Sequence, residues 1–269
     1  MGVITKITKQ VKNDERYNLF IDGTYAFSVD EGVLAKFGLR KGLEVDELAI
    51  SEMQYEDDVK KALNKAIHFL SFRMRTEDEV RDHLKRSEWE EGIVGEVIHK
   101  LKDMKYLNDL EFAQAFTGTQ INTSDKGPIW IRGELQRKGV DERYIEEALQ
   151  AFTFEEQVDK AVSISEKLMR KYRKDSVVIA KQKIEQNLQR KGYPNAVMKV
   201  VWETTDAERD ADEQWDAIYH QGQKAHRRLA AKFEGFEYEQ KMKQALYRKG
   251  FSMDKIERLL EVLKEEGGG

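Results

Sequence analysis

One pattern of apolar positions returns four times along the chain. In each copy a leucine stands four residues after another apolar residue, and three more apolar residues follow ten, thirteen and fourteen positions beyond that leucine. Spacings of three and four residues place side chains on one face of a helix, and the interval of ten leaves room for a turn. The pattern therefore predicts four pairs of helices, each pair sharing a buried seam. The seam residues are Val80, Leu84, Val94, Val97, Ile98; Ile131, Leu135, Ile145, Ala148, Leu149; Ile184, Leu188, Met198, Val201, Trp202; and Met242, Leu246, Ile256, Leu259, Leu260.

The turn inside each pair has its own signature. Three copies carry Arg137-Lys138-Gly139, Arg190-Lys191-Gly192 and Arg248-Lys249-Gly250. A glycine just past a helix end adopts the left-handed conformation that closes the last turn, and cations there oppose the negative end of the helix dipole. The first copy has Lys85 to Trp89 instead, as terminal repeats often deviate. Helix capping explains these cations, and a role in binding a partner is compatible with it.

The first 55 residues follow a different pattern. Residues 3–9 are rich in β-branched side chains, and the segments 17–21 and 25–29 flank Asp22-Gly23, a strong hairpin signal. We expect three antiparallel strands, then a short helix around residues 33–37 that residues 39–42 close. A module this small is expected to lean on the helices that follow it.

From residue 56 onward the pattern is helical. We expect a first helix from Asp57 to Met74, a second that begins at a capping box formed by Thr76 and Glu79, and a third that begins near Asn108. Pro128 suits the first position of the next helix. The predicted fold class is mainly α, a curved array of tandem three-helix repeats with a small antiparallel β-containing N-terminal module. The predicted units are a β module at 1–55, three-helix repeats at 56–122, 123–174 and 175–230, and a partial C-terminal repeat at 231–266.

Composition narrows the class of protein. Charged residues make up 36% of the chain and there are only two prolines, which suits a solvated helical array. The chain has no cysteine, so disulfides, thiolate metal sites and cysteine nucleophiles are excluded. No apolar run approaches the roughly 18 residues of a membrane span, and the N-terminus lacks the features of a signal peptide. We therefore expect a cytoplasmic protein.

Charge is distributed unevenly. Residues 165–191 carry a net charge of about +6, and residues 203–216 carry about −6. The acidic stretch from 204 to 216 is compatible with either a continuous helix or a spacer. The basic stretch could meet single-stranded DNA or an acidic protein surface, and the acidic stretch beside it would discourage indiscriminate binding to nucleic acid.

Motifs for catalysis are absent from the sequence. The five histidines are scattered, and no metal-ligand spacing, phosphate-binding loop or nucleophile elbow occurs. The carboxylate pairs Asp57-Asp58 and Glu155-Glu156 are typical of a solvated helix face rather than a catalytic dyad. We therefore predict a protein that is not an enzyme and that binds no metal or cofactor. Trp130 stands beside seam residue Ile131, where it could be presented to a partner.

Two strings go beyond a generic helical repeat. They are residues 106–113, Tyr-Leu-Asn-Asp-Leu-Glu-Phe-Ala, and residues 126–139, Lys-Gly-Pro-Ile-Trp-Ile-Arg-Gly-Glu-Leu-Gln-Arg-Lys-Gly. Together with Ile4-Thr5-Lys6 and residues 75–80 they resemble the RecX family, the bacterial regulators of RecA recombinase. The resemblance covers nearly the whole chain, and the N-terminal segment is similar to the longer form of Bacillus-type Firmicutes.

The resemblance implies a function by protein contact. Members of this family form curved arrays of three-helix repeats that bind in the groove of the RecA filament and suppress its ATPase, strand-exchange and co-protease activities. It implies RecA as the partner, weak single-stranded DNA contact as an accessory, and a monomer. The chain departs from the family pattern after Gly127-Pro128, where Ile129 and Trp130 replace a usual basic residue, and Arg132 is the nearest cation that can take its place.

Ten cations are the candidates for contact with RecA or DNA, and no residue is a candidate for catalysis. They are Arg132, Arg137, Lys138, Lys171, Arg173, Lys174, Arg190, Lys191, Arg248 and Lys249. Two alternatives stay open. The chain could be a single-stranded nucleic-acid binding module that competes with RecA for DNA, or a generic helical-repeat scaffold for another protein.

Overall fold

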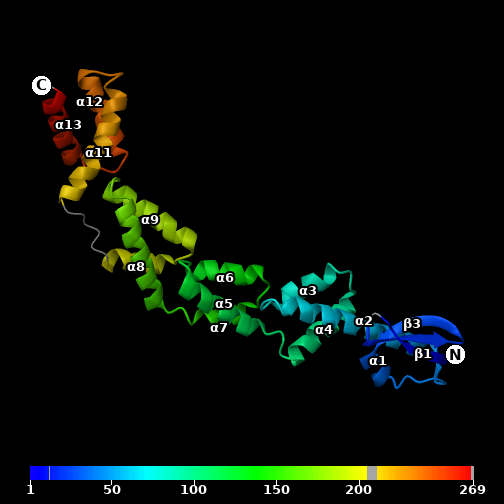
Figure 1. Ribbon diagram of the computed structural model, residues 1–269. Helices are drawn as coiled ribbons and strands as arrows, with labels where there is room; N and C mark the ends of the chain where they lie inside the picture. The colour runs from blue at the N-terminus through cyan, green and yellow to red at the C-terminus, as the bar shows by residue number, and fades with distance from the viewer. Residues whose placement is uncertain (12, 205–210, 268–269) are drawn as a thin grey trace. The chain divides into compact units, whose positions relative to one another are not determined.

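The computed structural model of the chain describes residues 1–11, 13–204 and 211–267 (Figure 1). The chain divides into two compact units, one of residues 1–113 with 136–145 and the other of residues 114–135 with 146–269. The first unit opens with an antiparallel sheet in the order β3-β2-β1-β4. Its strands are β1 (Gly2–Lys9), β2 (Arg16–Ile21), β3 (Thr24–Asp30) and β4 (Glu44–Val45).

The predicted hairpin is confirmed. Asp22 and Gly23 both have positive φ, 49° and 85°, as the favoured two-residue hairpin turn requires. Ile4, Leu19 and Val29 come from three different strands and are buried in one cluster at the centre of the module. The two-residue strand β4 was not predicted, because a strand this short leaves no alternation to detect.

Two predicted helix boundaries in this region are wrong. Helix α1 (Glu31–Lys36) ends before residues 39–42, because Gly38, with φ of 57°, follows its last turn. The next helix, α2, spans Glu47–Leu70 rather than 57–74. It begins early because the Asp46 side chain accepts a hydrogen bond from the Ala49 backbone at 2.8 Å and caps its first turn.

The remaining helices confirm a mainly α fold built from three-helix groups. The capping box at Thr76 and Glu79, the start of α5 at Asp109, and Pro128 in the first position of α6 are all as predicted. No helix in the described part of the chain is long and apolar enough to cross a membrane. The helices are α3 (Glu77–Lys85), α4 (Glu91–Asp103), α5 (Asp109–Thr123), α6 (Pro128–Arg137), α7 (Glu142–Leu149), α8 (Phe154–Lys171), α9 (Val177–Lys191), α10 (Asn195–Thr204), α11 (Ala211–Leu229), α12 (Gly235–Tyr247) and α13 (Met253–Gly267).

The repeated seam forms the core of each group. All of its residues are buried except Leu149 and Trp202, which are half-buried. Separate apolar clusters join α2 with α3 and α4, α8 with α9 and α10, and α11 with α12 and α13. The last group therefore has three helices like the others (Figure 1). Residues 205–210 of the acidic stretch lie outside the described residues, and α11 begins directly after them.

Candidate functional site

Each Arg-Lys-Gly turn contacts the start of a helix from an earlier repeat. The Thr76 hydroxyl, which caps α3, donates a hydrogen bond to the Lys138 carbonyl at 2.7 Å. The Gly127 amide, just before α6, donates to the Lys191 carbonyl at 2.7 Å. The Ser176 hydroxyl, which caps α9, donates to the Lys249 carbonyl at 2.5 Å. We call these three contacts the joints, and each lies inside one of the two compact units.

Each turn needs its glycine for two separate reasons. Gly139, Gly192 and Gly250 have φ of 75°, 87° and 76°, so each closes its helix in the left-handed conformation, as predicted. In addition, a Cβ on Gly139 would lie 2.4 Å from the Asp78 Cβ, and one on Gly192 would lie 2.3 Å from the Trp130 amide nitrogen. The joints therefore need glycine for close approach as well as for its backbone freedom.

The lysine of each turn is held within the fold. The Lys138 ammonium lies 3.2 Å from a Glu79 carboxylate oxygen. It also sits over the ring of Phe112, 5.7 Å from the centroid. The Lys191 ammonium lies 3.3 Å from a carboxylate oxygen of Asp125. The structure thus gives these two lysines intramolecular partners.

The arginine of each turn is the exposed cation. Arg137, Arg190 and Arg248 are all exposed. Arg190 makes a long hydrogen bond within its own helix, 3.4 Å from its Nε to the Gln186 carbonyl. Because the lysine and the glycine serve the joint, the arginine is the part of the signature best placed to meet another molecule.

The other candidate cations lie in several settings. Arg132 is half-buried, with its guanidinium 3.9 Å from Glu146. Lys171 is exposed over the ring of Tyr172, 5.8 Å from the centroid. Trp130, the proposed partner-facing aromatic, is half-buried, and the Lys126 ammonium lies 4.4 Å from its ring centroid. The structure therefore gives Trp130 a cation–π contact within the chain.

Three of the candidates gather with cations that the sequence did not single out. They are Lys174, which follows α8, and Arg248 and Lys249, which follow α12. Arg173 also follows α8 but is not part of this group. A cavity of about 230 Å³ is lined by Lys183, Arg248 and Lys249. We define the basic cluster as the seven residues Lys174, Lys183, His220, Lys224, Arg228, Arg248 and Lys249.

Electrostatics show that members of the basic cluster act on one another. Burial lowers the pKa of Lys249, and the neighbouring charges of Lys224 and Arg228 lower it further. Burial likewise lowers the pKa of His220, with Lys174, Lys224 and Lys249 adding to the effect. These pKa shifts arise because like charges and loss of solvent both disfavour the protonated form.

Four members of the basic cluster were not among the predicted contact residues, namely Lys183 of α9 and three residues of α11. His220, Lys224 and Arg228 recur every four residues, which places them on one face of that helix. That spacing was a detectable signal. Its meaning depends on the cations after α8 and α12, which lie far away in sequence.

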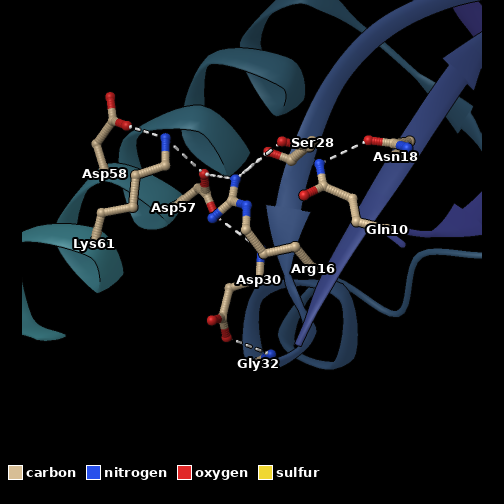
Figure 2. Close-up of polar contacts among 9 residues, drawn as sticks. All are labelled: Gln10, Arg16, Asn18, Ser28, Asp30, Gly32, Asp57, Asp58 and Lys61. Atoms are coloured by element: carbon tan, nitrogen blue, oxygen red, sulfur yellow. Dashed lines mark hydrogen bonds and ion pairs between the residues drawn. The ribbon is translucent and has the colours of Figure 1, made fainter. Parts of the chain in front are cut away.

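A buried ion pair fixes the N-terminal module to α2 (Figure 2). The Asp57 carboxylate accepts hydrogen bonds from the Arg16 guanidinium at 3.1 and 2.8 Å and from the Asp30 amide at 2.8 Å. Lys61 lies 2.9 Å from the same carboxylate. Burial would raise the pKa of Asp57, but the hydrogen bonds from Arg16, Lys61 and Asp30 outweigh it and lower the pKa. The interpretation of Asp57-Asp58 as part of a solvated face is thus wrong for Asp57, which is buried.

Comparison with known proteins gives matches along most of the chain. A model described as the regulatory protein RecX N-terminal domain matches residues 2–46, and models of the first and second RecX three-helix domains match residues 62–101 and 108–149. The model of the third three-helix domain matches residues 155–201 and 212–260. The chain belongs to the RecX family. The resemblance seen in the sequence is therefore confirmed.

Relatives and solved structures agree with this assignment. Regulatory protein RecX of Bacillus velezensis is 48% identical over 97% of this chain and 99% of its own length. The protein of the same name from Bacillus subtilis is 47% identical over 97% and 98%. A crystal structure of regulatory protein RecX, 37% identical, matches with a TM-score of 0.68 over 76% of this chain and 100% of its own. That of RecX from Lactobacillus salivarius, also 37% identical, matches with a TM-score of 0.55 over 57% and 99%.

The RecX assignment bears on the predicted chemistry. Its relatives carry the name of a regulatory protein and not of an enzyme. Among the residues that the structure describes, no group of three or more histidine, aspartate or glutamate side chains is arranged to hold a metal ion. The site to be explained is thus a set of surface cations on a helical-repeat scaffold.

Proposed function

We propose that this RecX chain is a mainly negative modulator of RecA that binds the groove of the RecA–single-stranded-DNA filament. Binding there suppresses the ATPase, strand-exchange and co-protease activities of the filament. The chain acts as a cytoplasmic monomer, and its own contact with single-stranded DNA is weak and accessory. Membership of the RecX family along the chain is the observation that carries this proposal.

The exposed arginines support an encounter by charge. Arg190 and Arg248 occupy equivalent turns of successive repeats, and both are exposed because their neighbouring lysines and glycines form joints. A planar guanidinium can form paired hydrogen bonds to a carboxylate or a phosphate. Equivalent turns in a repeat protein present equivalent side chains, which suits a partner that is itself a repeating polymer.

The deciding experiment is the single-stranded-DNA-dependent ATPase of the matching RecA, titrated with this chain. DNA binding by the chain alone is measured in the same buffer. We expect inhibition at substoichiometric amounts of the chain, with little DNA affinity of its own. Absence of any effect on RecA would reject the proposal and favour a scaffold for another protein.

A charge reversal then tests the arginines. Arg190→Glu is expected to weaken inhibition while leaving helicity, measured by circular dichroism, unchanged. Lys199→Glu is the control because Lys199 is also exposed, with 78% of its side chain accessible, on the neighbouring helix. It removes a 3.9 Å ion pair with Glu203, which is 62% exposed, so helicity is compared for the control as well. Adding Lys191→Glu to Arg190→Glu also breaks the contact with Asp125, so thermal stability must be compared for that double variant. Unaltered inhibition by Arg190→Glu would remove this turn from the contact surface.

The basic cluster favours a second candidate, competition with RecA for single-stranded DNA. In that case the chain binds DNA without RecA, and the affinity falls steeply with salt according to the number of phosphates neutralised. Inhibition would then appear only when the chain saturates the DNA. The same titration, repeated at several DNA concentrations, separates this candidate from direct action on the filament.

A further inference from the structure

The basic cluster holds more positive than negative charge. Asp175 is a carboxylate beside it, and it lines the same cavity as Lys183, Arg248 and Lys249. Among the described residues, no carboxylate lies within ion-pair distance of Lys174, Lys224, Arg228, Arg248 or Lys249. Lys183 pairs with Asp175 at 2.7 Å.

The half-buried lysine at the centre of the cluster is held in place by neutral groups. The Lys249 ammonium donates to the side-chain carbonyl of Gln221, and the Gln221 amide nitrogen donates to the Lys174 carbonyl at 2.7 Å. The Lys249 carbonyl accepts from Ser176 in the joint. Both ends of Lys249 are therefore fixed, and its charge cannot move freely into solvent.

The cavity beside Lys249 has the size and the donors for a small anion. Its volume is about 230 Å³, and its polar lining is Asp175, Ser176, Lys183, Gln221, Arg248 and Lys249. Asp175 is engaged by Lys183 at 2.7 Å, so the lining still carries a net positive charge. Burial is the main cause of the lowered pKa of Lys249, and repulsion from Lys224 and Arg228 adds to it, although Asp175 opposes the shift. An anion seated there would offset that repulsion and restore favourable charge interactions.

We propose that the basic cluster is a binding site for a phosphate group. Phosphate suits it better than a carboxylate because the cations come from several segments of the chain, and a tetrahedral dianion accepts donors from several directions. The cations come from the loop after α8, from α9, from α11 and from the turn after α12. The phosphate can be free in solution or part of a nucleic-acid backbone. The backbone case would supply the accessory DNA contact of the proposed function.

The test uses the full chain with two probes and no RecA. Inorganic pyrophosphate binding is measured by calorimetry, and binding of a fluorescent oligothymidine is measured by anisotropy across a salt series. The variant is Lys224→Gln with Arg228→Gln, since both side chains are exposed and have no ion pair to lose. The control is Arg227→Gln with Lys232→Gln, which removes the same charge from exposed positions outside the cluster.

We expect the cluster variant to weaken pyrophosphate binding at least tenfold and the control to leave it near the wild-type value. If the ligand is a nucleic-acid backbone, the slope of log affinity against log salt should fall by about 1.4, or about 0.7 for each cation removed. Pyrophosphate binding without oligothymidine binding identifies a free phosphate ligand and still supports the site. Equal effects of variant and control, or no binding of either probe by the wild type, would overturn the proposal. Because RecA is absent, these outcomes are independent of the ATPase result.

Discussion

Replacing Asp57 with asparagine should release the N-terminal module from α2. The carboxylate is 3% exposed and receives donors from the sheet and from its own helix (Figure 2). Asparagine has nearly the same shape but one acceptor oxygen, and its amide nitrogen would face a donor. The Arg16 guanidinium, 16% exposed, would then lose its charged partner.

The size of the effect follows from burial. Removing one partner of a buried ion pair costs about 3–5 kcal/mol, because the other charge is left without compensation. Arg16 keeps some access to water, so we place Asp57→Asn at about 3 kcal/mol, the lower end of that range. The population of the undocked module should rise on the order of 100-fold, at about 1.4 kcal/mol for each factor of ten.

Hydrogen exchange measured by mass spectrometry on residues 16–30 reports this opening directly. We expect exchange to accelerate there and to change little in the α11–α13 group. Asp58→Asn is the control, since Asp58 pairs with Lys61 at 2.9 Å but is 42% exposed, and such pairs contribute at most about 1 kcal/mol. A double-mutant cycle with Arg16→Gln isolates the pair. If Asp57→Asn and Asp58→Asn accelerate exchange equally, the argument from burial is wrong.

Three further predictions concern stability, each measured by urea or thermal unfolding. Because the pKa of Asp57 is lowered in the folded protein, its contribution is complete above pH 3.8 and is lost as pH falls through the folded pKa, so Asp57→Asn should flatten the acid dependence. Gly192→Ala should destabilise the folded protein more than Gly38→Ala. Both glycines have positive φ, but of the two only Gly192 has neighbours that an added Cβ would strike. Equal losses of stability in the two variants would reject the close-approach argument. Thr76→Val removes a helix cap and the hydrogen bond of a joint, whereas Thr153→Val removes an exposed helix cap alone. The loss in free energy of unfolding should therefore be about 1 kcal/mol larger for Thr76→Val.

The seams could be predicted because their information is local. Val80 and Leu84 lie on one face of one helix, and the period of the pattern reports that directly. The start of α2 was missed because the hydrophobic pattern weakens before Asp57, whereas the cap at Asp46 decides where the helix begins. Boundaries of this kind depend on single side-chain hydrogen bonds and leave little periodic signal.

The joints and the basic cluster could not be predicted in the same way. Thr76 and Lys138 are 62 residues apart, and Ser176 and Lys249 are 73 apart. The sequence around each of these residues contains no signal that identifies the residue it contacts. The sequence predicted the glycine and the cations of the turn as helix caps, which is correct, but their second role depends on how one repeat packs on the next. The division between structural lysine and exposed arginine follows only from that packing.

The joints also distinguish the first repeat from the last. The first repeat donates to a joint through Thr76, but its own turn has no glycine, and Glu88 takes the positive φ of 63°. The last repeat supplies Lys249 to a joint, but Glu234, the residue before α12, makes no side-chain cap hydrogen bond. A second copy that offered its first turn to that helix start would bring the Glu88 side chain to the position that glycine occupies in the other joints. We therefore expect this difference to disfavour head-to-tail fibres, the open polymers that such unclosed contacts produce.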